Sequence, residues 1–363
     1  MPTTTATRAA VAGLAVALAA PFLTSALATS SAADDTAGPP APPRAVTLVP
    51  GLVSPLSVAV GGRQTRWFSQ NFTGTLMRQR GDRPARPVYQ AERGVEVGAV
   101  SVHRGTVVFA TTLRRQTHLM RLGRGGAASE LADLGAHERR TNPDGGVRYG
   151  FRRLGADCAS QLPERFPARY RGIVESHPYA TTTAGGRTWV ADAAANAVLE
   201  VDRRGRVSTT AVLPPVPVRI TRAAAEANGM PACTVGHVYV FEGVPTDVEV
   251  GPRGQLYVSA LPGGPEDGST GAQGRVFRVD PASGEVTLVA KGLVSATGLA
   301  VTPRGAVYVA ELFGSRISRI APGARRARPF LPIGMPGDVE LHRGRLFATA
   351  DVLAEGRLVA IRR

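Results

Sequence analysis

A short phrase recurs along this chain and limits the folds that it can adopt. Its most regular copies are GVPTDVEVGPRGQLYVSA, from Gly243, and GLVSATGLAVTPRGAVYVAE, from Gly292. Each copy reads as a strand, a turn containing Pro or Gly, and a second strand, because apolar residues alternate with period two on both sides of the turn. Weaker copies begin at Gly51, Gly94, Ser176 and Gly334.

Strand–turn–strand units repeated at roughly 40 to 50 residues are typical of the blades of a β-propeller. The phrase therefore predicts an all-β fold, a six-bladed β-propeller of the NHL or TolB-like type, over residues 44–363. The last copy supplies only three strands. We expect residues 45–49 (AVTLV) to add the fourth, which would close the ring and remove an exposed sheet edge. The alternative is a free N-terminal arm beside a three-stranded last blade.

The N-terminal residues are typical of an export signal. Residues 1–28 contain one early Arg, an apolar stretch and the small-residue cleavage pattern Ala26-Leu27-Ala28, so we expect a secretory signal peptide cleaved near Ala28. Residues 29–43 are rich in Ala, Ser, Thr and Pro, which indicates a disordered spacer. No later stretch is long and apolar enough to span a bilayer. We therefore expect a secreted protein without a membrane span.

The formal net charge is +15, yet the pattern of basic residues does not indicate nucleic-acid binding. All basic residues except Lys291 are Arg, and they are scattered through turns and strand ends, while aromatic residues make up only 6% of the chain. A nucleic-acid-binding surface gathers basic residues on one face with aromatic residues between them. We expect no nucleic-acid partner and a solvated basic exterior, to which anionic cell-wall polymers or lipid surfaces are the alternative partners.

Two insertions interrupt the spacing of the phrase, near residues 135–176 and 214–235. We expect both to be loops on the same face of the propeller. The stretch TRAAAEAN, residues 221–228, favours a helix because Thr221 can cap it and Ala has a high helix propensity. Loops on a rigid scaffold commonly carry the binding site.

The chain has two cysteines, Cys158 and Cys233, and one lies in each insertion. In an exported protein such a pair is expected to form a disulfide, which would tie the insertions into a cap over one face. A catalytic thiol acting with His177 or His237 is the alternative.

Longer stretches of sequence point to a family. NPDGG from Asn142, VADAAANAVLEVD, CTVGHVYVFEGVPTDVEVGP and ATGLAVTPRGAVYVAELF up to Phe313 resemble the ScyD/ScyE family of exported six-bladed propellers, which has actinobacterial members. The resemblance extends over the chain after the spacer and is most specific between Asn142 and Phe313. It implies the propeller fold and export, and it implies no reaction.

A comparison with gluconolactonase-like propellers tests for a metal site. Those enzymes hold one divalent metal at the channel mouth through Glu, Asn and Asp at the starts of inner strands. The equivalent positions here are Leu56, Gly98, Pro178, Thr246, Thr297 and Gly337. None is a carboxylate, an amide or an imidazole, whereas a hard metal needs several converging oxygen ligands. We expect no cofactor, and a divalent cation such as calcium stays open without a motif to support it.

Polar residues near the starts of the inner strands are the candidate ligand-binding residues. They are Asp247, Asp338, Glu242, His177, Tyr179 and Glu175. Because the inner strands of a propeller surround its channel, we expect Asp247 and Asp338 at the channel mouth and the others on its rim. The alternative for each carboxylate is a structural role, in which it caps nearby backbone amides.

No GxSxG, HExxH or P-loop motif occurs in the chain. We therefore expect a non-catalytic, monomeric binding or scaffold protein that presents its capped face to a small molecule, a glycan or a protein. The alternative is a lactonase-like or hydrolase-like enzyme that uses carboxylates at the channel mouth, with or without a divalent metal. Only analogy of fold favours this alternative.

Overall fold

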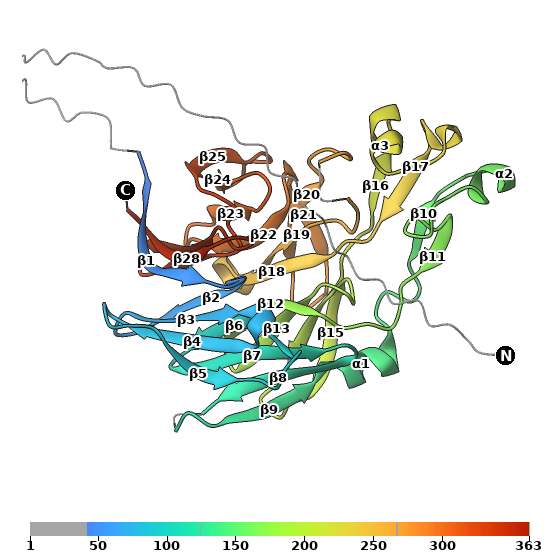
Figure 1. Ribbon diagram of the computed structural model, residues 1–363. Helices are drawn as coiled ribbons and strands as arrows, with labels where there is room; N and C mark the ends of the chain where they lie inside the picture. Colours follow the sequence, from blue (N-terminus) through green and yellow to red (C-terminus); the bar gives the residue numbers. More distant parts are fainter. Residues whose placement is uncertain (1–41, 124, 266–267, 363) are drawn as a thin grey trace, which may run out of the picture. The chain divides into compact units, whose positions relative to one another are not determined.

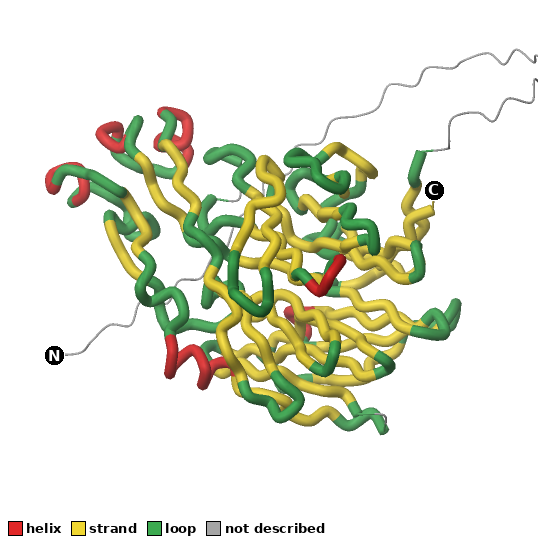
Figure 2. The backbone as a smooth tube through the Cα atoms, turned by 180° about the vertical axis from the view of Figure 1, so that it is seen from behind, coloured by secondary structure: helices red, strands yellow, loops and turns green. Residues whose placement is uncertain are grey.

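The computed structural model describes residues 42–362 apart from 124 and 266–267, and these residues belong to one compact unit, Ala41–Arg363. The predicted signal peptide and residues 29–41 of the predicted spacer lie outside the described residues. Strands are the main regular structure of the described chain, and they are arranged in seven four-stranded antiparallel sheets (Figures 1 and 2). None of the described helices is long and apolar enough to cross a membrane.

Six of the sheets follow one another along the chain. The first contains β2 (Val58–Gly61), β3 (Thr65–Gln70), β4 (Thr75–Arg80) and β5 (Arg86–Gln90). The second contains β6 (Glu96–His103), β7 (Thr106–Leu113), β8 (Gln116–Leu122) and β9 (Ala128–Asp133). The third contains β12 (Pro178–Ala184), β13 (Arg187–Asp192), β14 (Ala197–Val201) and β15 (Val207–Val212).

The remaining three of these sheets have the same order. The fourth contains β18 (Pro245–Val250), β19 (Leu256–Ala260), β20 (Gly274–Val279) and β21 (Val286–Leu293). The fifth contains β22 (Ala296–Val301), β23 (Val307–Glu311), β24 (Arg316–Ile320) and β25 (Arg328–Pro332). The sixth contains β26 (Val339–His342), β27 (Arg345–Ala350), β28 (Gly356–Arg362) and β1 (Arg44–Leu52).

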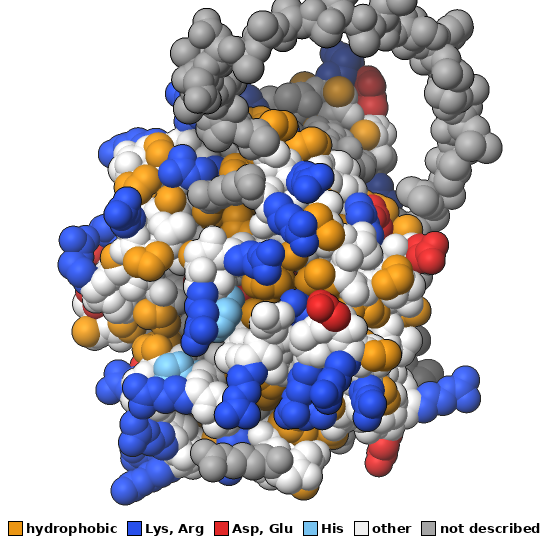
Figure 3. All heavy atoms as spheres, turned by 90° about the vertical axis from the view of Figure 1, so that its left-hand side faces the viewer, with side chains coloured by type: hydrophobic (Ala, Val, Ile, Leu, Met, Phe, Trp, Pro, Cys, Tyr) orange, Lys and Arg blue, Asp and Glu red, His pale blue; other side chains and the backbone are white. Residues whose placement is uncertain are grey.

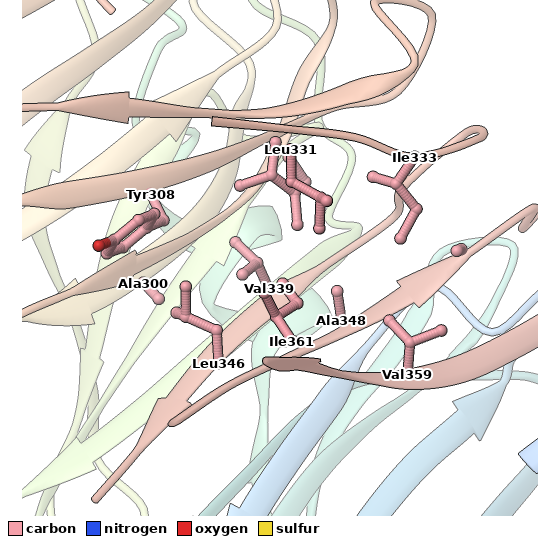
Figure 4. Close-up of a cluster of buried hydrophobic side chains, with 12 residues drawn as sticks. Ala300, Tyr308, Leu331, Ile333, Val339, Leu346, Ala348, Val359 and Ile361 are labelled. Atoms are coloured by element: carbon pink, nitrogen blue, oxygen red, sulfur yellow. The ribbon is translucent and has the colours of Figure 1, made fainter. Parts of the chain in front are cut away.

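The first strands of these sheets contact one another in a closed cycle, from β2 through β6, β12, β18, β22 and β26 back to β2. A separate cluster of buried apolar side chains fills the space between each pair of consecutive sheets. In Figure 4, Tyr308 and Leu331 of the fifth sheet pack with Val339 and Leu346 of the sixth. Stacking at both faces explains why a strand such as β23 (VYVAE) is buried along its whole length. The chain therefore has a β-propeller fold.

The N-terminal strand closes the last of these sheets, as predicted. β1 pairs with β28 in antiparallel register, with Ala45 opposite Ile361 and Thr47 opposite Val359. Leu52 at the end of β1 joins a core cluster that also contains Val58 of the first sheet, so this strand contributes to packing as well as to the ladder.

The prediction that the two insertions are loops is wrong. They form the seventh sheet, in the order β11-β10-β17-β16, and the second insertion continues to Phe241 rather than ending near Val235. The first insertion contains α1 (Leu134–Thr141), β10 (Arg148–Phe151), α2 (Ala156–Ala159) and β11 (Arg169–Arg171). The second contains β16 (Val216–Arg219), α3 (Arg222–Ala227), η2 (Ala232–Thr234) and β17 (Val238–Phe241).

The seventh sheet forms because alternate residues of its strands are large and apolar. Phe151, Val218, Tyr239 and Phe241 belong to a buried cluster of its own. The predicted helix at residues 221–228 is present as α3, and the Thr221 hydroxyl accepts a hydrogen bond from the Ala224 amide at 3.0 Å. In Figure 1 this sheet and its helices, in green and yellow, project from the other sheets.

The disulfide between Cys158 and Cys233 is present, as predicted. It joins α2 to η2, with a Cα–Cα distance of 6.0 Å, and so links the two insertions at one end of the seventh sheet. Because both thiols are consumed, the alternative of a catalytic thiol is wrong.

Replacing both cysteines with Ser should loosen the seventh sheet more than the others. The bond joins residues 75 positions apart, and closing such a loop stabilises a protein by about 2 to 4 kcal/mol. We expect faster amide hydrogen exchange in β10, β11, β16 and β17 of C158S/C233S, and unchanged exchange in β22–β28, which pack on separate clusters. Equal acceleration in both regions would contradict this expectation.

Candidate functional site

The six predicted site residues separate into three groups: Asp247 with Asp338; Glu175 with His177 and Tyr179; and Glu242 alone. All of them lie near the starts of inner strands. Because the strands of each sheet run antiparallel, the turns between second and third strands lie at this same end of the sheets, and so do the insertions. The groups differ in their partners, and these partners determine what each can do.

Asp247 and Asp338 each join two neighbouring sheets. Asp247 accepts hydrogen bonds from the amide of Val248 at 2.7 Å and from the amide of Leu299, on the next inner strand, at 2.6 Å. Asp338 accepts in the same way from Val339 at 2.7 Å and from Val58, on β2, at 2.8 Å. Both carboxylates therefore have the structural role that the sequence left as the alternative.

Four carboxylates line a small central cavity of about 100 Å³, because Glu249 and Glu340 follow the two aspartates by two residues and face the same side of their strands. Burial raises the pKa of all four, that of Asp338 to about 6, and the charge of Asp338 raises the other three further. The sequence analysis missed both glutamates, although the spacing Asp-x-Glu in PTDVEV and PGDVEL was available as a signal.

The metal site of gluconolactonase-like enzymes does not fit this chain. In the part of the chain that the structure describes, no three His, Cys, Asp or Glu side chains are arranged to hold a metal ion. The oxygens of Asp247 and Asp338 already accept backbone amides, which would have to be replaced before a cation could bind.

Glu242 lies against the seventh sheet rather than in the channel. Burial is the main reason that the pKa of the Tyr170 phenol is raised, and the nearby Glu242 carboxylate raises it further. Glu242 therefore contributes to the contact between the seventh sheet and the start of β18.

His177 and Glu175 lie on a separate pocket of about 320 Å³. Its lining comes from the turn after β3, from the start of β6, from the end of β7 and from the segment before β12: Phe72, Gly94, Glu96, Thr112, Arg114, Glu175 and His177. The pocket therefore lies between the first three sheets, on the face where their inner strands begin.

An ion pair between Glu96 and His177 forms one wall of this pocket. Nε2 of His177 lies 2.9 Å from Oε2 of Glu96, and the Asn71 amide donates to Oε1 of Glu96 at 2.8 Å. The ring of Tyr179 packs edge-on against the imidazole, with the centroids 5.1 Å apart. Asn71 and His177 together hold both oxygens of the Glu96 carboxylate in place.

A buried carboxylate fixes the backbone that carries the histidine. Asp192, at the end of β13, accepts a hydrogen bond from the His177 amide at 2.7 Å and another from the Ser176 hydroxyl at 2.5 Å. Because Asp192 is fully buried, these bonds do not compete with water, and His177 is held at the pocket by the core of the third sheet.

The surroundings of the Glu96–His177 pair favour its charged form. Burial alone would favour the neutral forms, but the hydrogen bond and the opposite charge raise the pKa of His177 and lower the pKa of Glu96. Arg114 and Glu175 add one charge of each sign to the lining, and Phe72 on the rim is 66% exposed. The pocket thus presents hydrogen-bond donors, acceptors and one apolar ring.

The sequence analysis identified Glu175, His177 and Tyr179 but not Glu96. Glu96 lies in a weak copy of the phrase, GVEVGAVSV, at the position that Ser54, Ser295 and Met335 occupy in other copies. The only sequence signal for Glu96 was its charge at a position of the repeated phrase that is uncharged in the other copies.

Comparisons with known proteins support the fold. Similar structures include a gluconolactonase from Xanthomonas campestris (TM-score 0.55, 14% identity, 88% of this chain and 89% of that chain). They also include a PQQ-bound aldose sugar dehydrogenase from Streptomyces coelicolor (0.53, 13%, 90% and 99%). A protein of unknown function from Bacteroides thetaiotaomicron has a TM-score of 0.57 at 10% identity, over 88% of this chain and 76% of that one. At these identities the likeness shows the fold alone.

No protein-family model matches this chain, and no curated protein matches it. The predicted all-β propeller fold is confirmed by the sheets and by these structural neighbours, and the resemblance to the ScyD/ScyE family stays a prediction. On the face in Figure 3, Lys and Arg side chains are spread among hydrophobic and uncharged ones, as the sequence predicted for the exterior in general.

Titration of His177 should show a pKa above the ordinary value of about 6.5. A raised folded-state pKa means that the ion pair contributes fully below about pH 6.5 and is lost as the pH rises through the folded-state value. Imidazole chemical shifts measured by NMR would give this pKa. Glu96→Gln should lower it, whereas Glu92→Gln, an exposed control outside the pocket, should leave it unchanged. A wild-type value at or below 6.5 would contradict the charged pair.

Charge in the central cavity should destabilise the fold near neutral pH. Unfolded carboxyls titrate near pH 4, and these four retain protons to a higher pH in the native state. Their contribution to stability therefore falls as the pH rises from about 4 past 6. Glu249→Gln should raise Tm at pH 7 but not at pH 4, while the exposed control Glu355→Gln should change neither. A lower Tm at pH 7 would show that the Glu249 charge is stabilising.

Proposed function

We propose that this chain is an exported six-bladed β-propeller that binds a small ligand rich in hydroxyl groups in the pocket built around Glu96 and His177. The closed cycle of six inner strands supports the blade count, with the seventh sheet as an appendage. The leader-like N-terminus and the disulfide support export, because disulfides persist in oxidising compartments. Membership of the ScyD/ScyE family is part of the same proposal.

The Glu96–His177 ion pair is the observation that carries the proposal. Its groups are held from behind by Asn71 and Asp192, and they border a pocket whose volume of about 320 Å³ falls in the range of small-molecule sites. Carboxylates accept hydrogen bonds from hydroxyls, Arg114 donates them, and the exposed ring of Phe72 can cover an apolar face. Because the charges on the lining nearly cancel, the ligand is neutral or carries a single charge, as a sugar or a sugar acid does.

Binding of simple sugars tests this proposal. Aldoses, aldonic acids and aldonolactones would be screened by thermal shift and measured by calorimetry with the wild type, Glu96→Gln and Glu92→Gln. Loss of one hydrogen bond to a charged group costs about tenfold in affinity. We expect that loss for Glu96→Gln and wild-type affinity for Glu92→Gln. Equal affinities in all three proteins, or no binding to the wild type, would reject the pocket as a sugar site.

A hydrolase acting at the same pocket is the second candidate. The observation that favours it is that His177, whose pKa is raised by Glu96, and a separate carboxylate, Glu175, line one pocket. Glu175 would take a proton from water, the resulting hydroxide would attack an ester or lactone carbonyl, and His177 would protonate the leaving oxygen. The products are an acid and an alcohol. One structural neighbour is a gluconolactonase, which makes a sugar lactone the natural probe.

Hydrolysis separates the two candidates. An acid–base residue contributes about 10² to 10⁴ in rate, so a hydrolase should lose that much in kcat with Glu175→Gln or His177→Gln. Lactone hydrolysis at the background rate, with binding retained, would establish a binding protein. Neither candidate requires a metal or a redox cofactor.

A further inference from the structure

The seventh sheet has one apolar face and one arginine-rich face. Because neighbouring residues of a strand point to opposite sides, Tyr149 and Phe151 enter the buried side while Arg148 and Arg152 point the other way. A hollow of about 600 Å³ borders these arginines, and it is lined by Arg148, Tyr149, Gly150, Phe151, Arg152, Arg169, Tyr170, Arg171 and Val240. Four of these residues are arginines, all of them exposed, and none is a carboxylate.

The arrangement of these arginines is unfavourable without an anion. Arg148 and Arg171 are direct cross-strand partners in the pairing of β10 with β11, and like charges in that position destabilise a sheet. Within residues 42–362, with their gaps at 124 and 266–267, none of the ion pairs involves an arginine of this hollow. The sheet tolerates this repulsion because its other face is anchored by a buried apolar cluster.

Gly150 is one of the residues that line the hollow. It has φ +91°, and a Cβ there would lie 2.5 Å from the carbonyl oxygen of Ala168. Glycine is therefore required at this position, because the backbone of Ala168 and Arg169 occupies the space that a side chain would need.

We propose that this face of the seventh sheet binds a linear polymer of phosphate groups. Guanidinium groups bind phosphate oxygens through paired hydrogen bonds. Arg148 and Arg152 are four residues apart along the chain, roughly 13 Å at the rise of a strand, and Arg171 and Arg169 lie on the paired strand β11. Four guanidinium groups spread over two strands can each engage a different phosphate of one polymer. The net charge of +15 adds long-range attraction for such a polymer.

Other polyanions fit this face less well. Single-stranded nucleic acid binds through bases stacked on exposed aromatic rings, but Tyr149 and Phe151 are each 2% exposed. Tyr170 is only partly buried, and its ring packs against that of Tyr149 with the centroids 5.3 Å apart. A membrane surface is bound through apolar side chains that enter the lipid, and Val240, the apolar residue of the hollow on this side, is 8% exposed. The site is separate from the Glu96–His177 pocket, so it does not depend on the function proposed there.

The test is the binding of fluorescent inorganic polyphosphate of one defined length to the disulfide-bonded protein, measured by anisotropy. We expect R148Q/R171Q to bind at least about tenfold more weakly. The control R325Q/R326Q, which removes two exposed arginines from the turn before β25, should bind as the wild type does. Affinity should fall steeply between about 50 and 200 mM salt, and orthophosphate at equal phosphate concentration should compete poorly.

The folded state of the variant is checked in the same samples. Because Arg148 and Arg171 repel each other, R148Q/R171Q without polymer should be at least as stable as the wild type by thermal unfolding. If it is less stable, R152Q/R169Q is used instead, with the same expected loss of binding. This variant leaves the cross-strand pair of Arg148 and Arg171 in place.

Four results would overturn the proposal. The first is no binding to the wild type, and the second is equal weakening in R325Q/R326Q, which would indicate net charge alone. The third is full competition by orthophosphate, which would indicate a site for one ion. The fourth is equally tight binding of single-stranded DNA or of anionic phospholipid vesicles with the same dependence on Arg148 and Arg171, which would assign the face to nucleic acid or to membrane.

Discussion

Hydrogen bonds from polar side chains to the backbone of the next inner strand hold this fold together. Neighbouring sheets of a propeller share no backbone ladder, so apolar packing and side chains must join them. The Ser57 hydroxyl accepts from the Val100 amide at 2.8 Å, and the Thr181 hydroxyl donates to the Ala99 carbonyl at 2.8 Å. Asp247 and Asp338 make the corresponding links elsewhere in the cycle. This requirement explains why most polar residues at the centre are engaged with the protein itself.

Acidic residues on different inner strands consequently have opposite chemistry. The carboxylates of the central cavity face one another, and burial together with their mutual repulsion favours their protonated forms. Glu96 begins an inner strand of the same cycle, but it meets His177 and Asn71, which favour its ionised form. Position in the repeat therefore does not determine function. The partner that the neighbouring sheet supplies decides whether a carboxylate supports the scaffold or serves a pocket.

The repeated phrase was sufficient to predict the strands, the closure by residues 45–49 and the face on which the insertions lie. The paired cysteines and α3 were also predictable, because they depend on local composition and compartment. The seventh sheet was not, since β11 and β16 have only three and four residues. In addition, the central pair of the sheet, β10 with β17, joins strands from different insertions. Glu96 was missed for a related reason: its role depends on His177, which the sequence places 81 positions away.

The pairing of β1 with β28 also determines which sheet contains both ends of the described chain. Arg44 and Arg362 are register partners, so the two ends of the described chain lie side by side within one sheet. Among the described sheets, only this one combines strands from opposite ends of the sequence. Hydrogen bonds and the cluster around Leu52 hold β1 and β28 together. Joining these ends with a short peptide and opening a hairpin in another sheet would move the chain ends to that sheet without altering the architecture. The position of the chain ends is therefore a matter of connectivity, separate from the packing that makes the fold.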